Sequence, residues 1–250
     1  KDPAPQLEDD KVTLDLWHWQ DGMLQPMQSR RAEDLRNRAI DCAWHFAERR
    51  FVVLGDKEID NVTLITPDGS RAIAHDESPY LKQVSWDGSY NDVYLINTQD
   101  GSRPRVLCGL RGNVSASPGG RWLTWFGTDR HWHSMDVATR TERTLTTNLG
   151  VAFFAEDWDQ PGPARSHGVG GWLKANPAPL VYHQYDVWKV AADGSRQACI
   201  TDGYGRANHL QFGAVRLDPE QDALDPARPL LLSASNDDTK ASGYYEDTLD

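Results

Sequence analysis

Long apolar runs are absent from this chain of 250 residues. A membrane-spanning helix needs about 18 or more consecutive apolar residues, and residues 1–5 (KDPAP) are too polar for the hydrophobic centre of a secretion signal. We therefore expect no membrane partner. An initiator Met is missing as well, so we expect a processed or excised piece of a longer protein.

Cysteine is scarce. The three cysteines, Cys42, Cys108 and Cys199, are odd in number and widely spaced. Neither a disulfide framework nor a C-x-x-C metal or redox motif can be inferred from that spacing. We expect all three to be small buried hydrophobic residues.

Positive charge is in deficit, with 26 Lys and Arg against 37 Asp and Glu and a formal net charge of -11. Such a chain repels a phosphate backbone, so nucleic acid and anionic membrane surfaces are excluded as partners. The hydrophobic content of 39% is enough for a buried core, which excludes a disordered chain.

A serine with the spacing of an α/β-hydrolase nucleophile is also missing. That spacing is G-x-S-x-G, whereas the serines nearest to it follow a glycine directly: Ser70, Ser89, Ser102 and Ser195. No Cys–His constellation replaces it. We therefore predict no catalytic, cofactor-binding or metal-binding residue, and we expect the chain not to cleave peptide or ester substrates.

Short strands separated by Asp, Gly and Pro turns fill most of the chain, and helical periodicity is rare. Near the start we expect a strand over residues 12–16, a turn at 20–22, a helix over 26–38, and strands over 39–46 and 51–54. Residues 159–179 and 217–229 are rich in Pro, Gly or acidic residues, which predicts two long loops.

Two patterns repeat after residue 60. The turn at 66–69 (TPDG) recurs at 117–120 (SPGG), so Pro67 and Pro118 lie 51 positions apart (118 minus 67). The strand at 92–96 recurs at 186–190, with a middle copy at 133–137. A period of about 47 residues built from strands and Gly-bearing turns is typical of β-propeller blades.

The sequence therefore predicts an all-β fold with blades of four-stranded antiparallel sheets. About five to six blades fit the length, as part of a larger propeller. In that case the first and last sheets expose unpaired edges or apolar faces, and we expect dimerisation or aggregation through these ends. The apolar positions at 12–16 and a strand beginning at 243–245 would form those ends.

Several segments resemble the propeller region of bacterial prolyl oligopeptidase-family (S9) serine peptidases. They are residues 14–21 (LDLWHWQD), 24–26 (LQP), 171–173 (GWL), 185–188 (YDVW) and 201–208 (TDGYGRAN). Turns of the Ser-Pro-Asp-Gly kind are shared with other propellers, such as those related to TolB. The Trp-rich and Gly-Tyr-Gly-Arg segments point more specifically to the peptidases.

The resemblance implies a two-domain parent protein in which a propeller restricts access to an α/β-hydrolase domain carrying a Ser-Asp-His triad. Residues 1–250 would be a β-propeller domain or fragment, with the catalytic domain absent from this chain. The implied role is gating or scaffolding, and the implied partners are the hydrolase domain of the same protein and a peptide substrate. Location in the periplasm or outside the cell is implied by the resemblance as well.

Two alternatives stay open. One is a stand-alone TolB-like propeller that binds a protein partner. The other is a propeller enzyme that acts on glycans, which would need two carboxyl groups about 5 to 9.5 Å apart in a central funnel.

Some residue types could support chemistry. His131 and His133 could point to one face of a strand and present two metal ligands, but no third ligand is indicated, and aromatic packing explains them better. His167 and His183 are expected to be hydrogen-bonded structural residues. Arg206 could hold a carboxylate, although pairing with a nearby acid is the simpler expectation.

The paired acids and the tryptophans can each be interpreted as functional or as structural residues. We expect the acidic pairs at 156–157 and 237–238 to lie on a solvated face. The tryptophans could form a stacking surface for sugars or peptides, but packing between blades explains them better. That interpretation places five of them on strands: Trp17, Trp19, Trp122, Trp125 and Trp188.

Overall fold

The structure, a computed structural model, describes residues 14, 16–59, 61–174, 177–218 and 220–249. Within them, strands far outweigh helices, as predicted. The helices are α1 (Gln25–Arg36), the 3-10 helix η2 (Ser78–Gln83) and α2 (Tyr204–Asn208). Helix α1 confirms the helix predicted over residues 26–38. It has a proline, Pro26, in its first turn and buries none of its residues.

Five antiparallel sheets account for the described strands, and neighbours in each sheet follow one another in the sequence. The first sheet pairs β1 (Cys42–His45) with β2 (Arg50–Val53); the second contains β3 (Val62–Leu64), β4 (Arg71–Asp76), β5 (Asn91–Asn97) and β6 (Arg105–Leu110); the third contains β7 (Ser115–Ala116), β8 (Trp122–Phe126), β9 (Trp132–Asp136) and β10 (Thr141–Thr144). The fourth contains β11 (Val169–Trp172), β12 (Pro179–Tyr182), β13 (Val187–Val190) and β14 (Gln197–Cys199); the fifth contains β15 (Leu210–Ala214), β16 (Leu230–Asn236) and β17 (Ser242–Asp247).

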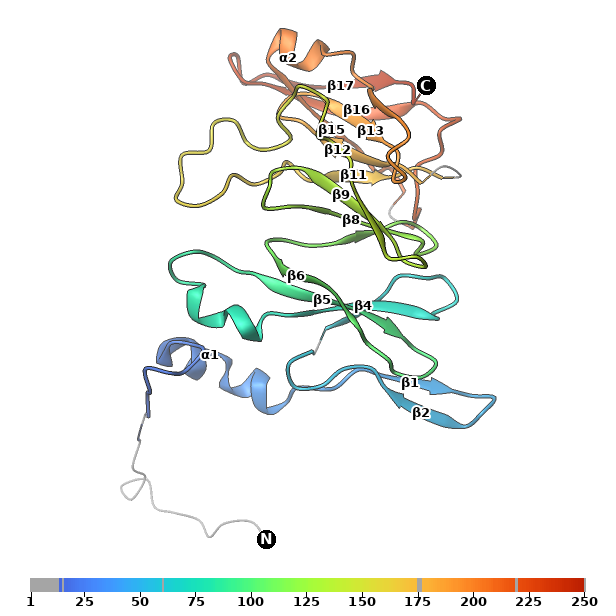
Figure 1. Ribbon diagram of the computed structural model, residues 1–250. Helices are drawn as coiled ribbons and strands as arrows, with labels where there is room; N and C mark the ends of the chain where they lie inside the picture. The colour runs from blue at the N-terminus through green and yellow to red at the C-terminus, as the bar shows by residue number, and fades with distance from the viewer. Residues whose placement is uncertain (1–13, 15, 60, 175–176, 219, 250) are drawn as a thin grey trace.

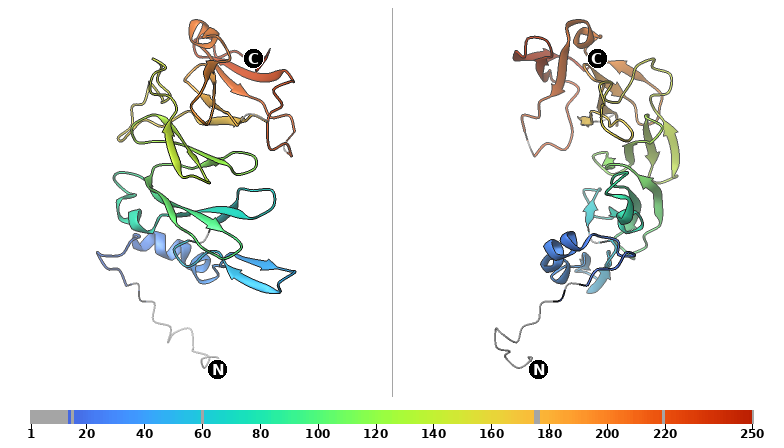
Figure 2. Two further views of the ribbon diagram at one scale, coloured as in Figure 1. Left: turned by 45° about the vertical axis from the view of Figure 1, so that its right-hand side comes forward. Right: turned by 90° about the vertical axis from the view of Figure 1, so that its left-hand side faces the viewer.

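The sheets stack in chain order from β1–β2 at one end to β15–β17 at the other (Figure 1). Seen from the side, the stack bends into an open arc whose first and last sheets lie far from each other (Figure 2). Four-stranded antiparallel sheets packed in this way are propeller blades. The chain is therefore an all-β protein with the blade architecture predicted from its repeats.

Apolar contacts between successive sheets form the core. Val52 of the first sheet packs with Ala72 and Ile96 of the second. Ile73 and Leu95 of the second sheet pack with Leu123 of the third. Further along, the third sheet meets the fourth through Trp132 and Val181, and the fourth meets the fifth through Leu180 and Leu232. Each blade thus covers an apolar face of its neighbour, which is why the repeats stack.

The repeated turns have a common physical cause. In three Asp-Gly-Ser turns the aspartate accepts the backbone N–H of the serine two residues later, with Asp-to-Ser distances of 3.0, 2.8 and 2.9 Å at 68–70, 100–102 and 193–195. The middle glycines have φ of 69°, 75° and 74°, a conformation that glycine adopts without strain. Hydrogen bonds from Ser70 lower the pKa of Asp68 to about 2. Ser70, Ser102 and Ser195 are therefore turn residues.

Four local predictions were wrong. Leu14 and Leu16 lie outside any strand and are exposed, while Val12 lies outside the described residues. Trp17 and Trp19 are exposed and off the strands as well. The loop predicted over 159–179 contains β11, which pairs with β12. The loop over 217–229 is confirmed between β15 and β16.

The fourth wrong prediction concerns the three cysteines. Cys42 and Cys108 are exposed and Cys199 is half-buried, so none of them is the buried hydrophobic residue that was expected. Cys42 and Cys108 lie on β1 and β6, at positions whose side chains are not covered by a neighbouring sheet. Strand membership alone did not decide which face each side chain occupies.

Candidate functional site

The two edges of the arc differ. Tight hairpins such as β3–β4 and β7–β8 form one edge. The other carries the turns between the second and third strands of the four-stranded sheets and the crossings that follow these sheets, and we call it the loop edge: residues 77–90, 111–114, 127–131, 145–168, 183–186 and 200–209 (Figure 1). In a four-stranded meander the chain reverses direction at every turn. The turn between the second and third strands therefore lies at the same edge as the crossing from the fourth strand to the next sheet. The loop edge is therefore where segments distant in sequence meet.

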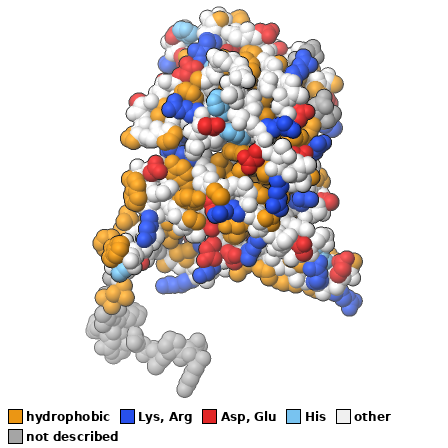
Figure 3. All heavy atoms as spheres, viewed as in Figure 1, with side chains coloured by type: hydrophobic (Ala, Val, Ile, Leu, Met, Phe, Trp, Pro, Cys, Tyr) orange, Lys and Arg blue, Asp and Glu red, His pale blue; other side chains and the backbone are white. Residues whose placement is uncertain are grey.

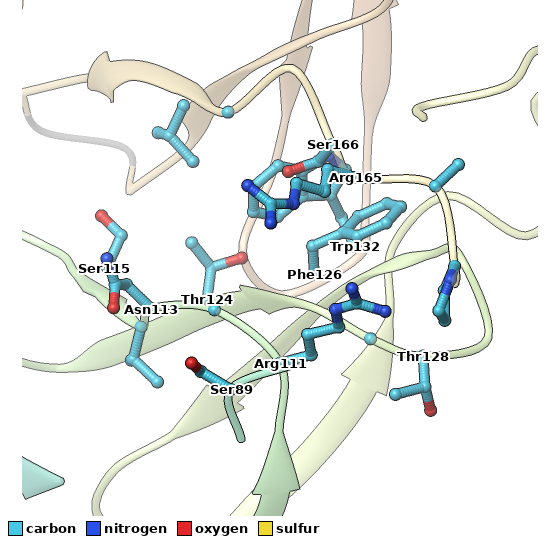
Figure 4. A pocket seen from close by; sticks show the side chains of 17 residues that line it. Ser89, Arg111, Asn113, Ser115, Thr124, Phe126, Thr128, Trp132, Arg165 and Ser166 are labelled. Carbon is cyan, nitrogen blue, oxygen red and sulfur yellow. The ribbon is translucent and has the colours of Figure 1, made fainter. Parts of the chain in front are cut away.

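A cavity of about 530 Å³ opens at this edge. We call it the arginine pocket, because Arg111 and Arg165 line it from two different connections. Arg111 lies between β6 and β7, Arg165 lies just before β11, and Phe126 and Trp132 lie between them (Figure 4). Its volume is within the range of small-ligand sites.

The polar lining of the arginine pocket is positive. None of its lining residues is an acid. Within the described part of the chain, neither Arg111 nor Arg165 forms an ion pair with a carboxylate; Arg111 lies over the ring of Tyr90 and Arg165 over that of Trp158. In a chain with a net charge of -11, two arginines without acidic partners in one cavity are unusual.

Two hydrogen-bond donors of the arginine pocket lack partners. Of the side-chain atoms that the structure describes, Nη1 of Arg111 and Nε1 of Trp132 are buried without a hydrogen bond. Trp132 itself is 4% exposed. A buried donor without a partner costs about 1–3 kcal/mol, so the pocket contains donors that a bound acceptor would satisfy.

Local packing holds Arg111 in place. A Cβ added at Gly88 or Gly162 would lie 3.2 or 3.1 Å from a guanidinium nitrogen of Arg111, and both glycines have positive φ. Glycine at these two positions leaves room for the guanidinium group. Trp132 is fixed by an edge-on contact with Phe126, with ring centroids 5.5 Å apart.

A second polar group lies further along the loop edge, around Arg206. Its guanidinium pairs with Glu156, lies 2.7 Å from Nε2 of His183, and covers the ring of Tyr185 at 5.3 Å. Burial, together with Arg206, lowers the pKa of His183. Although burial alone would raise the pKa of Glu156, its hydrogen bond to Arg206 holds that pKa below its usual value. This group, which we call the Arg206 cluster, satisfies its own charges.

Asp186 anchors the Arg206 cluster to the fold. It is 3% exposed and accepts hydrogen bonds from the Thr201 hydroxyl at 2.7 Å and the Gly205 N–H at 2.9 Å. Asp92 has the equivalent place in the second sheet, where it accepts from Tyr80 at 2.5 Å and from the Gly109 N–H at 2.9 Å. Asp186 thus ties the start of β13 to the connection that leaves its sheet, whereas Asp92 ties β5 to η2 and β6; both roles are structural.

The predicted candidates occupy different places. His131 lies 3.3 Å from the Thr146 hydroxyl, whereas His133 pairs with Asp129 at 2.8 Å and stacks on Trp125. No group of three or more metal-ligating side chains occurs among the residues that the structure describes. That the protein has no metal, cofactor or catalytic residue remains a prediction.

The remaining expectations have mixed outcomes. Arg206 pairs with an acid and His183 is hydrogen-bonded, as predicted. His167 is hydrogen-bonded to the backbone of Phe154, but its Nε2 is buried without a partner in the described structure. Trp122, Trp125 and Trp188 lie on strands, as expected.

The acidic pairs at 156–157 and 237–238 are exposed or half-exposed, as predicted, and three of the four acids also have polar partners. Asp237 accepts from Gln211 at 2.8 Å, and Asp238 lies 2.8 Å from the ring of His209. Glu156 belongs to the Arg206 cluster.

The arginine pocket was not predicted, because nothing in the sequence connects Arg111 with Arg165. The only local signal was the density of glycines and prolines before residue 171.

Comparisons with known proteins give structural neighbours only. No family model and no curated protein matches the chain. A solved structure of the β-propeller domain of the trilobed protease from Pyrococcus furiosus matches 79% of this chain at 12% identity, with a TM-score of 0.43. This chain spans 55% of that domain.

Two further solved structures are similar in part. Oligogalacturonate lyase from Vibrio parahaemolyticus matches 84% of this chain and 69% of its own at 12% identity, with a TM-score of 0.33. The acylaminoacyl peptidase of Pyrococcus horikoshii matches 77% of this chain and 25% of its own at 8% identity, with a TM-score of 0.29. At these scores the matches carry no argument about function. The blade architecture follows from the strand pairing of the chain itself.

Proposed function

We propose that this chain is the non-catalytic β-propeller portion of a prolyl oligopeptidase-type serine peptidase. In this role it binds peptide and restricts its access to an α/β-hydrolase domain elsewhere in the same protein. The sequence resemblance supplies the family, and the absence of a G-x-S-x-G serine assigns hydrolysis to another part of the protein.

The observation that supports this proposal most is the uncovered apolar surface at the first sheet. Phe46 and Phe51 are 84% and 60% exposed, and both contact the ring of Trp44. Helix α1, which precedes this sheet in the chain, buries none of its residues, and hydrophobic side chains gather on the surface at this end of the molecule (Figure 3). Isolated soluble domains rarely expose large apolar patches, so this surface fits a blade that packs on further parts of a longer protein.

The shape of the arc also favours a portion of a ring over a closed stand-alone propeller. A closed ring would bring its first and last sheets together, whereas the described first and fifth sheets lie at opposite ends (Figure 2). None of the helices within the described residues is long and apolar enough to span a bilayer.

The test is the reading frame that encodes the chain, followed by labelling. We expect a G-x-S-x-G elbow within roughly a few hundred residues downstream. A fluorophosphonate probe should label the full translation product at that serine and leave the 250-residue chain unlabelled. A stop codon directly after residue 250, or stoichiometric labelling of the chain alone that heat denaturation abolishes, would contradict the proposal.

A further inference from the structure

The arginine pocket has a chemical selectivity that can be derived from its lining. Its lining includes Arg111, Arg165 and Trp132, whose guanidinium and indole N–H groups donate hydrogen bonds and cannot accept them. Ser89 adds a hydroxyl group to the lining, whereas the Thr124 hydroxyl already donates to the backbone carbonyl of His133 (Figure 4). Since no acid lines the cavity, its ligand should be an acceptor with negative charge.

The unpartnered donors point to the same ligand. Nη1 of Arg111 and Nε1 of Trp132 are buried and have no partner among the described residues, although almost all buried polar atoms in proteins are hydrogen-bonded. Trp132 is 4% exposed and lines the cavity. An anionic acceptor that reaches either donor would satisfy it.

The apolar part of the lining narrows the class of anion. Phe126, Val114 and Val169 line the same cavity as the two arginines. A carboxylate attached to a small carbon skeleton matches a lining that is both cationic and apolar, because guanidinium binds carboxylates in a planar, two-pronged geometry. A free phosphate has no apolar part to place there.

We propose that the arginine pocket binds the carboxylate of a peptide, with Arg111 as the principal cation, Arg165 as a second cation and Trp132 as a neutral donor. This inference rests on the proposed function for the identity of the ligand as a peptide. The recognition of a carboxylate rests on the pocket alone and does not require a hydrolase domain.

The pocket also assigns an orientation. Arg111 is half-buried and packed between Gly88 and Gly162, whereas Arg165 is exposed. A carboxylate paired with Arg111 is therefore the deeper end of the ligand, and the chain leads outward past Arg165. A peptide C-terminus fits this arrangement better than a side-chain carboxylate in the middle of a peptide, which would require two outgoing chains.

The experiment is calorimetric titration of the full 250-residue chain with matched probes. They are acetyl-Ala-Ala-Ala with a free carboxylate, the same peptide as its C-terminal amide, acetyl-Ala-Glu-Ala amide, N-acetylalanine and inorganic phosphate. We expect the free-carboxylate peptide to bind about tenfold or more tightly than its amide, since one charge-assisted interaction is lost.

Variants locate the binding. Arg111→Gln should weaken the free-carboxylate peptide about tenfold, Arg111→Lys should restore part of the loss, and Arg165→Gln should have a smaller effect. Arg130→Gln is the matched control, because Arg130 is an exposed arginine on the same loop edge that lies over Phe154 and does not line the pocket. It should change binding less than about twofold.

Each outcome decides a separate point. Equal binding of acid and amide, no binding of any carboxylate probe, phosphate binding as tight as the peptide, or equal effects of Arg111→Gln and Arg130→Gln would overturn the pocket assignment. Tight binding of N-acetylalanine with no gain for the peptides would support the carboxylate site and count against the proposed peptide function. Preference for the glutamate-containing amide would overturn the C-terminal orientation.

Discussion

The middle of the arc and its first sheet are built from the same strand pattern but have different surroundings. The third sheet has neighbours on both faces, and its β8 is buried over Trp122–Trp125. In the first sheet, β2 keeps only Val52 buried, and Phe51 and Val53 are exposed. The comparison teaches that a blade's stability depends on its neighbours. The first sheet should therefore be less stable than the third sheet as long as nothing else covers it.

The largest contrast should come from truncating one apolar residue in each region. Leu123 of β8 is 0% exposed in the core between the second and third sheets, so Leu123→Ala should lower the free energy of unfolding by about 2–5 kcal/mol. Phe51→Ala removes a side chain that is 60% exposed and should cost less than about 1 kcal/mol. Urea denaturation of the two variants measures both, and equal losses would contradict the contrast.

A smaller loss of unfolding free energy is expected when the buried hydrogen bonds of Asp186 are removed. Asp186→Ala removes the acceptor for Thr201, Gly205 and the Arg206 N–H, so we expect a loss of about 2–3 kcal/mol and faster amide exchange in α2. Asp193→Ala, in an exposed Asp-Gly-Ser turn, is the control and should cost less than about 1 kcal/mol. Unchanged exchange in α2 would show that Asp186 does not hold it.

The Arg206 cluster predicts a dependence of stability on pH. Burial and Arg206 lower the pKa of His183 in the folded chain below the ordinary value of 6.5. As the pH falls through about 6.5, the unfolded chain binds more protons than the folded chain, so the free energy of unfolding decreases; the contribution is fully present above that pH. His167 contributes in the same direction, because burial lowers its pKa as well.

Urea midpoints at about pH 7.5 and about pH 5.5 measure this dependence. His183→Gln should lose less stability between the two pH values than the unchanged chain does, and the remaining loss should reflect His167 and other groups. His209→Gln serves as the control, because His209 is an exposed partner of Asp238. Identical pH slopes for the unchanged chain and His183→Gln would rule out the buried neutral histidine.

The smallest effect concerns the arginine pocket. Gly162 and Gly119 have φ of 96° and 101°, so alanine causes similar backbone strain at each. Only at Gly162 does the new Cβ meet the Arg111 guanidinium, at 3.1 Å, whereas at Gly119 it meets nothing within 4 Å. Gly162→Ala should weaken peptide-carboxylate binding about threefold and Gly119→Ala should not. Titration of both variants with acetyl-Ala-Ala-Ala checks this, and equal affinities would show that Gly162 does not position Arg111.

Local signals were enough to predict the blades. The Asp-Gly-Ser turns at 68–70 and 193–195 and the strands at 92–96 and 186–190 depend on short-range hydrogen bonding and alternation, both of which are visible in the sequence. The alternation at 12–16 led to a wrong strand prediction. Leu14 and Leu16 are exposed, which shows that an apolar pattern does not reveal whether another part of the chain covers those side chains.

The same reasoning could not predict the candidate site. Arg111 and Arg165 lie 54 positions apart (165 minus 111), in two connections that meet only because the second, third and fourth sheets stack. Arg206 was predicted to pair with an acid, yet its partner Glu156 is 50 positions away and could not be chosen from several candidates. Pairings across sheets depend on how the blades pack, which the sequence pattern of one blade does not contain.

In the proposed function, the first sheet packs on another part of a longer protein. Hydrogen–deuterium exchange of β1–β2 amides, in the 250-residue chain and in the full translation product of its reading frame, tests this directly, with β8–β9 as the internal reference. We expect β1–β2 to exchange quickly in the chain alone and to be protected in the full protein, with β8–β9 protected in both. Equal exchange of β1–β2 in the two proteins would contradict the claim.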